Sequence, residues 1–209
     1  MPAGVKSIGE GTFKGSYALT AINVSYDNIA YSSEDGVLYD KNKTILYACP
    51  GGRNGSFTIP SSVTNIGKKA FAGCYYLSSV SIPRSVTTIE DGAFNGCRDL
   101  IAVYSSNPVP PTTNGSCFIG ISWLATLYVP ANSVEAYRNA AEWNEFQYIK
   151  EFDPTGINCI EAERSKKNTY YDLNGRKLNG PLKGLNIING RKVMVHRSEL
   201  SKVTKRSRP

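Results

Sequence analysis

The stretch "IPSSVTNIGKKAFAGCYYLSSVSIPRSVTTIEDGAFNGCRDL", residues 59–100, contains one short segment twice. Identical or similar residues recur 23 positions apart along it. The matching pairs are Ile59 and Ile82, Pro60 and Pro83, Val63 and Val86, Ile66 and Ile89, Phe71 and Phe94, Cys74 and Cys97, and Leu77 and Leu100. A repeat of about 20 to 50 residues is typical of a solenoid, in which each unit packs only against its neighbours.

The repeat continues in both directions. Upstream, residues 2–24 align with residues 60–82 at an offset of 58, which matches Phe13 to Phe71 and Ile22 to Val80. Downstream the spacing changes to 24. It then matches Phe94 to Phe118, Leu100 to Leu124 and Val103 to Leu127. We expect four or five coils, stacked about 4.8 Å apart like neighbouring strands.

Each coil is expected to contain two short strands and a tight bend. Residues 77–82, Leu-Ser-Ser-Val-Ser-Ile, alternate at their end like a strand with one buried face, and Pro83 ends it. Residues 86–89, Val-Thr-Thr-Ile, predict a second strand. The segment "DGAFNGC" (91–97) is long enough only for a helical turn, with Phe94 directed into the core.

The segment "IPSSVTNIGKKAFAGCYYLSSVSIP" resembles the BspA-like leucine-rich repeat family of bacterial surface proteins. The resemblance covers roughly residues 2–151; residues 34–52 resemble a hairpin that such proteins insert between coils, and residues 127–146 their closing segment. It implies a right-handed, β-rich solenoid on an exported or surface-displayed protein used for binding. The whole of residues 1–153 would form this α/β repeat domain.

The hairpin and the closing segment also have local signals. Val37-Leu38-Tyr39 and Ile45-Leu46-Tyr47 flank the polar turn "DKNK". After Pro130, Asn132 or Ser133 can serve as a helix N-cap. The helix would place Val134, Tyr137 and Ala141 on one face, with Trp143 and Phe146 following. We expect it to act as a capping helix over the exposed end of the solenoid.

The composition changes near residue 155. Residues 1–154 contain 11 Lys+Arg and 13 Asp+Glu (net −2), whereas residues 155–209 contain 13 and 4 (net +9). Turn signals at Asn174-Gly175 and Asn189-Gly190 predict a small antiparallel β module over residues 157–196. This module resembles the sorting domains of type IX secretion, which implies contact with envelope or secretion machinery. Residues 197–209 form a basic tail that we expect to be disordered.

The basic C-terminal part could contact nucleic acid or an anionic membrane, but its charges are scattered and lack interleaved aromatic residues. Solvated surface is the favoured interpretation, with no specific nucleic acid as a partner. No apolar run is long enough for a transmembrane segment. Met1 directly precedes a residue already in repeat register, without a signal peptide, so we expect a fragment of a longer exported protein.

The sequence contains few residues or motifs that are typical of catalytic sites. The single histidine, His196, follows the last predicted strand, and no HExxH, GxSxG or P-loop pattern occurs. The acidic pairs Glu34-Asp35 and Glu90-Asp91 could supply glycosidase carboxylates, but both lie at turns, where acidic residues are common. We expect no enzyme, no cofactor and no metal site.

Five cysteines are present. Cys74 and Cys97 occupy the same position of adjacent coils, so either a disulfide or a ladder of buried free thiols is conceivable. Parallel stacked side chains seldom reach disulfide geometry, which favours the thiols. Cys49, Cys117 and Cys159 have no partner in the repeat.

The exposed strand face of the repeats is the candidate binding surface. If Ile22, Val80, Val103 and Leu127 point inward, their neighbours form one outward column. That column contains Asn23, Ser81, Tyr104 and Tyr128, and Tyr75 and Tyr76 lie at a coil edge. Tyrosines among small polar residues suit recognition, because they offer large contact area at low entropic cost; simple covering of neighbouring strands is the alternative.

We therefore expect a cell-surface or secreted adhesion protein that binds a host or matrix protein or a glycan through this face. The alternative is a structural spacer or anchoring module that acts through residues 157–196.

Overall fold

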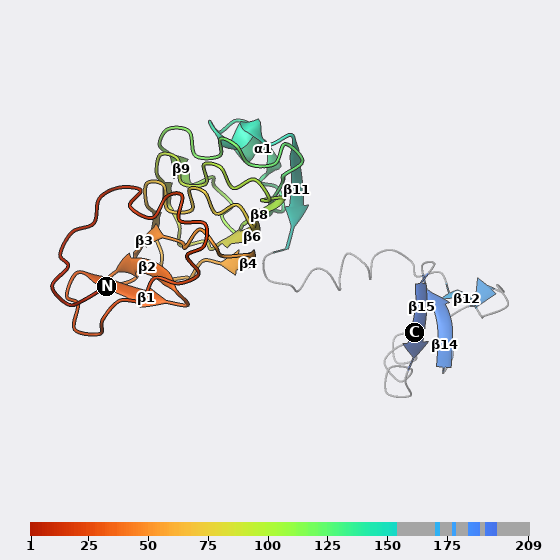
Figure 1. The fold of residues 1–209 in the computed structure, drawn as a ribbon. Helices are drawn as coiled ribbons and strands as arrows, with labels where there is room; N and C mark the ends of the chain where they lie inside the picture. Colours follow the sequence, from red (N-terminus) through yellow and green to blue (C-terminus); the bar gives the residue numbers. More distant parts are fainter. Residues whose placement is uncertain (154–169, 172–176, 179–183, 189–190, 196–209) are drawn as a thin grey trace, which may run out of the picture. The chain divides into compact units, whose positions relative to one another are not determined.

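The computed structural model describes residues 1–153 and the strands at 170–171, 177–178, 184–188 and 191–195. The chain forms two units, Met1–Pro154 and Thr155–Pro209. The first unit is a β-rich solenoid (Figure 1). The second is described by itself at the end of this section.

The long strands of successive coils form one side of the solenoid. These strands are β4 (Gly55–Thr58), β6 (Leu77–Ile82), β8 (Ala102–Ser105), β10 (Thr126–Pro130) and β11 (Tyr148–Phe152). They pair in parallel in the order β11-β10-β8-β6-β4. Strand β6 has the bounds that the sequence predicts, and its parallel neighbours confirm that the repeats stack as coils.

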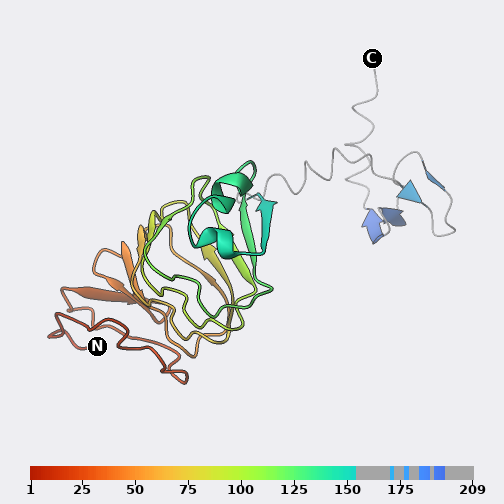
Figure 2. The ribbon, with the colours of Figure 1, turned by 90° about the horizontal axis from the view of Figure 1, so that it is seen from above.

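A second sheet forms the opposite side (Figure 2). Its coil strands are β5 (Asn65–Ile66), β7 (Thr88–Ile89) and β9 (Thr112–Thr113), which are parallel. The sheet continues through β3 (Ile45–Ala48), β2 (Val37–Asp40) and β1 (Tyr31–Glu34). β1, β2 and β3 are antiparallel to one another, and β3 pairs in parallel with β5.

The bends between the two sheets form a third ladder. Phe71 N–H donates to Ala93 O (2.7 Å) and Phe94 N–H to Cys117 O (2.9 Å), so the bends of successive coils are bonded through their backbones. The repeat places glycine in this bend because the chain adopts positive φ there, 80° at Gly73 and 77° at Gly96.

The core runs through the coils as an aromatic ladder. Phe71 stacks on Phe94 at 4.8 Å between ring centroids, and Phe94 stacks on Phe118 at 5.4 Å. Val80 and Val103 are 0% exposed, as expected for inward positions of β6 and β8. Each coil therefore contributes one ring and one strand to a core that its neighbours complete.

The segment after β10 packs against the last ring of this ladder. It contains helix α1 (Val134–Arg138) and a 3₁₀ turn, η1 (Trp143–Glu145), at the end of the stack away from the N-terminus (Figure 1). Trp143 and Phe146 both lie 5.0 Å from Phe118 between ring centroids. Ser133 is the N-cap residue, but its side chain makes no capping hydrogen bond.

The helix is shorter than the sequence suggested. It ends at Arg138, so Ala141 lies outside it and does not share a helical face with Tyr137. Glu142 adopts a φ of 65°, which is incompatible with a continuing right-handed helix. Aromatic packing, rather than a long amphipathic helix, holds this segment in place.

Residues 1–30, called the N-terminal unit from here on, depart from the predicted stack. Ile22 is buried in a separate cluster with Tyr31, Leu38 and Ala48, and Phe57 of β4, not Ile22, pairs with Val80. Strands β1, β2 and β3 follow residues 1–30 in the chain, and β4, the next strand, takes the place that Ile22 was expected to occupy. The repeat offsets in the sequence fit both Ile22 and Phe57 as the neighbour of Val80, so they did not discriminate between these two residues.

A second departure occurs in the last bend. Leu124, which the offset of 24 matches to buried Leu100, is 49% exposed. Ala125 is buried instead, and its N–H donates to Ser122 O as Leu100 N–H donates to Cys97 O. The bend contains one additional residue here, which displaces Leu124 to the surface.

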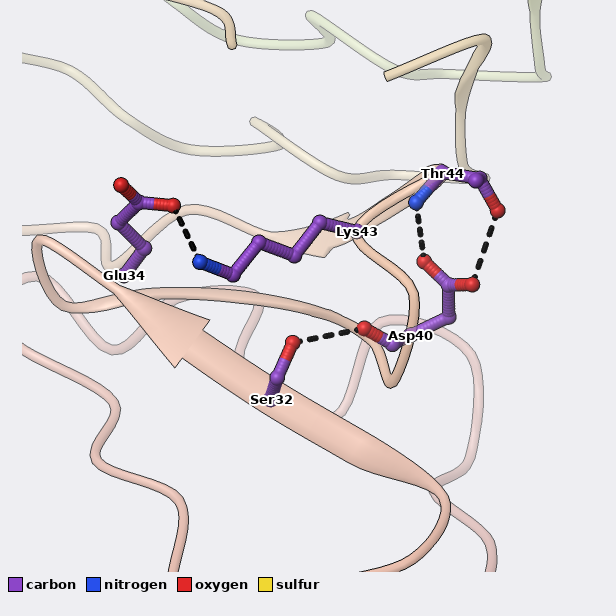
Figure 3. A network of polar contacts seen from close by, with 5 residues as sticks. All are labelled: Ser32, Glu34, Asp40, Lys43 and Thr44. Carbon is purple, nitrogen blue, oxygen red and sulfur yellow. Dashed lines mark hydrogen bonds and ion pairs between the residues drawn. The ribbon is translucent and has the colours of Figure 1, made fainter. Parts of the chain in front are cut away.

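The turn between β2 and β3 is held by side chains (Figure 3). Asp40 Oδ1 accepts from Thr44 N–H (2.6 Å) and Asp40 Oδ2 from Thr44 Oγ1–H (2.9 Å). Lys43 Nζ lies 2.6 Å from Glu34 Oε2, and Ser32 Oγ donates to Asp40 O. An aspartate that binds backbone N–H groups two to five residues on is a common way to fix such a turn.

In the second unit four strands pair antiparallel. They are β12 (Tyr170–Tyr171), β13 (Lys177–Leu178), β14 (Gly184–Ile188) and β15 (Arg191–Val195), in the order β13-β12-β14-β15. The predicted turns Asn174-Gly175 and Asn189-Gly190, as well as Cys159, His196 and the tail 197–209, lie outside the described residues.

Candidate binding surface

The outer face of the long-strand sheet carries two columns of side chains. One column runs through Ser79, Ala102, Thr126 and Tyr148, and the other through Thr58, Ser81, Tyr104, Tyr128 and Lys150. Burial alternates along β8 and β10, with inward residues fully buried and the outward ones half-buried. The sheet therefore fixes the spacing of the candidate residues Ser81, Tyr104 and Tyr128.

Aromatic side chains gather on the part of this face formed by β8, β10 and β11. The rings of Tyr104 and Tyr128 stack at 4.6 Å with 12° between their planes. Phe152 meets Tyr104 edge-on at 5.5 Å. Neighbouring parallel strands bring the two tyrosines together because they are paired residues in the ladder. The sequence predicted the tyrosine pair; Phe152 was missed, because β11 pairs with β10 at an offset of 22 residues and not 24, which places Phe152 opposite Pro130.

The part of the face formed by β4 and β6 is rich in hydroxyl groups. Ser56, Thr58, Ser79 and Ser81 supply these groups, and none carries a charge. Thr58 pairs with Ser81, so it occupies the position that Asn23 was expected to fill. Asn23 is therefore not part of the surface; it lies in the N-terminal segment, where its backbone oxygen accepts from the N-terminal amine of Met1.

Charge is confined to one margin of the face. Among the outward residues of β4, β6, β8 and β10 none is charged, whereas β11 presents Lys150; Glu151 pairs with inward Val129 and lies on the other face. Glu151 accepts from the backbone N–H of Asn132 (2.8 Å). Recognition through this face would therefore depend on ring contacts and hydroxyl hydrogen bonds, with little dependence on salt.

Tyr75 and Tyr76 lie on the bend side, away from the strand face. Tyr75 stacks on Tyr17 at 4.5 Å, and the two hydroxyl groups are 2.9 Å apart. The guanidinium of Arg98 lies 5.0 Å from the other face of the Tyr75 ring. The hydrogen bond to Tyr75 raises the pKa of Tyr17 above its ordinary value. The offset of 58 relates Tyr17 to Tyr75, but sequence reasoning did not single out Tyr17.

Tyr76 is 53% exposed beside this stack. The six candidate residues thus divide between the strand face, the bend edge and, for Asn23, the N-terminal segment. The structure brings only Ser81, Tyr104 and Tyr128 together.

The four described cysteines are buried free thiols. Burial raises the pKa of Cys97 well above its ordinary value, and it raises that of Cys117 to about 12. Cys74 Sγ–H lies within 3.7 Å of the backbone oxygen of Cys49, so Cys49 lies at this end of the ladder although it has no equivalent in the repeat. The pKa of Cys49 is raised too, mainly by a hydrogen bond with Cys74 and to a lesser extent by burial. Thiols in this state are poor nucleophiles.

The acidic pairs are engaged in structural contacts. Glu34 and Asp35 form ion pairs with Lys43 and Arg53, respectively. Glu90 accepts from Asn65 Nδ2–H (2.7 Å) and from the backbone N–H of Lys68 (3.1 Å). Within the described part of the chain, no three His, Cys, Asp or Glu side chains are grouped as metal ligands would be.

A model of the BspA type leucine-rich repeat region matches residues 47–153 in six copies. The chain belongs to this family. The match begins in β3, so residues 1–46, which include β1 and β2, lie outside it. None of the comparisons indicates a catalytic family, and none of the helices in the described residues has the length and apolar character needed to cross a membrane.

Two solved bacterial structures resemble this BspA-type chain. One is a leucine-rich repeat protein from Eubacterium ventriosum, with 29% identity and a TM-score of 0.54 over 71% of this chain and 40% of that one. The other is a leucine-rich cell surface protein from Faecalibacterium prausnitzii, with 26% identity and a TM-score of 0.53 over 77% and 49%. The chain spans less than half of either structure. A comparison with curated proteins gives no match.

Proposed function

We propose that this BspA-type protein is a non-enzymatic binding or adhesion protein, secreted or displayed on the cell surface. Its ligand is a host or matrix protein or a glycan, recognised through the outer face of β4, β6, β8 and β10. Family membership and the likeness to a cell surface protein support the location.

The observation that carries the proposal is the stacked pair Tyr104 and Tyr128 on a rigid sheet. Their rings are already ordered by each other and by Phe152, so binding would cost little side-chain entropy. The adjacent hydroxyl groups of Ser79 and Ser81 add hydrogen bonds without the desolvation cost of a charge. Aromatic anchors beside small polar groups are common in recognition surfaces.

The test is a binding screen of the purified chain against immobilised matrix proteins and glycans. For any ligand found, Tyr104→Ala combined with Tyr128→Ala should weaken binding at least about tenfold, equivalent to about 1.4 kcal/mol. Tyr26→Ala removes an exposed tyrosine of the N-terminal unit and should leave affinity unchanged. Tyr76→Ala tests the bend edge. Full affinity in the double variant would contradict the proposal, and a loss in Tyr76→Ala would move the site to the bend.

A second candidate role is anchoring through residues 157–196. The separate antiparallel sheet of β12 to β15 and the net charge of +9 in residues 155–209 favour it, as does the resemblance to type IX sorting domains. Deleting residues 157–209 should then abolish surface display while ligand binding is retained. Retained display would contradict this role and leave the solenoid as the only functional part.

On the same proposal, residues 127–146 close the end of the solenoid, and residues 34–52, which contain β2 and β3, form a hairpin inserted between coils. The contacts of Trp143 and Phe146 with Phe118 support the first assignment. The antiparallel pairing of β2 with β3 supports the second.

A further inference from the structure

A cavity of about 190 Å³ lies between the N-terminal unit and the coil that contains β5. Residues 8–14 form one wall, and residues 67–72 and β3 form the others. It is on the bend side of the solenoid, whereas the proposed binding face is the outer side of the long-strand sheet.

The cavity exists because the backbone ladder of the bends is interrupted there. Lys69 N–H donates to Asp91 O (3.0 Å) and Phe71 N–H to Ala93 O (2.7 Å), and similar bonds join the next pair of coils. Between residues 8–14 and residues 67–72, both fully described, no such backbone bond forms. The bend formed by residues 8–14 is therefore not bonded through its backbone to the bend at residues 67–72. The cavity lies between these two bends, with β3 beside it.

The lining contains both apolar and charged residues. The apolar ones are Ile8, Phe13, Leu38, Ile45, Ala48, Cys49, Ala70 and Ala72. The charged ones are Glu10, Lys14, Lys68, Lys69 and Glu90. A pocket with an apolar body and a few polar groups at its mouth is typical of small-molecule sites.

Lys69 occupies an unusual position. It has a φ of 58°, in the left-handed region that a long side chain rarely adopts. The equivalent position in the other coils is glycine: Gly11 (φ 66°), Gly92 (φ 65°) and Gly115 (φ 72°). The repeat therefore requires this backbone conformation, and only the coil beside the cavity places a lysine there.

Lys69 has no direct ion-pair partner in residues 1–153, and neither has Lys14. Glu10 is paired with Lys68 Nζ at 2.8 Å, and after Lys68 the charge of Lys69 also lowers the pKa of Glu10. Glu90 is hydrogen-bonded to Asn65 and to the backbone of Lys68. Three lysines against two glutamates give the lining a net charge of +1.

We propose that this cavity binds a small apolar molecule that carries one carboxylate, with Lys69 as its counter-ion. The apolar lining residues accommodate the apolar body, and the ammonium group of Lys69 meets the carboxylate. The size suits a single ring with a short substituent, since an apolar protein cavity of about 150 Å³ is sufficient for benzene. Lys69 thus has a ligand-binding role that explains a side chain at a position where the other coils use glycine.

The test uses three probes with one ring and different charge: benzoate, benzamide and benzylamine. Binding to the whole chain is measured by ligand-observed NMR and isothermal titration calorimetry at low ionic strength. Benzoate should bind at least about tenfold more tightly than benzylamine, with benzamide between them. Equal binding of benzoate and benzylamine, or no binding of any probe at millimolar concentration, would overturn the proposal.

Three variants assign the effect. Lys69→Asn removes the charge and keeps a residue that tolerates positive φ, so the preference for benzoate should disappear while the thermal midpoint is unchanged or higher. Lys69→Arg should keep the preference, and Lys150→Asn on the far strand face serves as the control. A retained preference in Lys69→Asn would overturn the proposal. A midpoint several degrees lower would also overturn it, because the lysine would then serve to pack its stem over Gly11 and Gly92.

Discussion

The N-terminal unit and the central coils contain the same apolar pattern but bury it differently. Phe94 lies between two stacked rings and is fully buried, whereas Phe13, at the equivalent position of residues 2–24, is only partly buried. The same holds for Ile8 against Ile66 and for Leu19 against Leu77.

The difference shows that burial in this fold belongs to the stack and not to the single unit. A central coil has a neighbour on both sides, and its ring, strand and bend are all completed by those neighbours. The N-terminal unit meets the stack mainly at its bend, where Tyr17 stacks on Tyr75. At residues 8–14, by contrast, the cavity lined by Lys69 lies between the N-terminal unit and the coils.

The largest effect should come from removing a central ring. Phe94→Ala is expected to lower the free energy of unfolding by about 3–5 kcal/mol, since it deletes a fully buried ring between two others. Phe13→Ala should cost no more than about 1–2 kcal/mol, because its ring is already partly in water. Urea denaturation of both variants measures the difference. Equal losses would show that the two units are equivalent and would break the comparison.

Alkaline pH should weaken the coils through their buried thiols. Burial raises the pKa of Cys117 to about 12, above the ordinary value of 9.0, so the folded state holds its proton after the unfolded state has lost it. Its stabilisation is complete below pH 9 and is lost as the pH rises toward 12. Between pH 8 and pH 10.5 this costs up to about 2 kcal/mol.

Urea denaturation at the two pH values measures this loss. Cys117→Ala should lose less stability than the native chain over the same interval. An identical pH dependence in the variant and the native chain would mean that Cys117 is not buried as a neutral thiol.

Replacing a bend glycine by alanine should cause the same backbone strain in the N-terminal unit as in the central coils. Gly15 (φ 82°) and Gly96 (φ 77°) occupy the same bend position, and an added Cβ meets only ordinary contacts at each. Gly15→Ala and Gly96→Ala should each cost about 1–2 kcal/mol, because alanine is strained in the left-handed region. Thermal denaturation tests this. A loss confined to Gly96→Ala would show that the N-terminal bend is not ordered in the same way.

Much of the fold was predictable from periodicity alone. The offset of 23 predicts the parallel pairing of Val80 with Val103, because a one-residue slip would turn every inward side chain outward. The offset of 58 was misleading for Ile22, since it describes similarity and not adjacency. An insert between two similar units allows a later strand, here the one containing Phe57, to take the adjacent place.

The candidate surface was predictable where it followed the ladder and not elsewhere. Tyr104 and Tyr128 stack because they are paired residues of neighbouring strands. Phe152 of β11 reaches Tyr104 of β8 across the intervening strand β10, which the repeat spacing does not specify. Tyr17 follows the offset of 58 to its partner Tyr75, but sequence reasoning did not single it out. The sequence shows Lys69 at a position where the other coils have glycine. A role for its side chain can be proposed only from the structure, which shows the cavity beside it.

Native-state hydrogen exchange tests the shared burial of the coils most directly. Amides of β6 and β8 should exchange only through global unfolding, whereas those of residues 8–19 should exchange roughly 100-fold faster through local opening. Equal protection of the two regions would contradict the account, since it would mean that the N-terminal unit is as fully stacked as the coils that follow it.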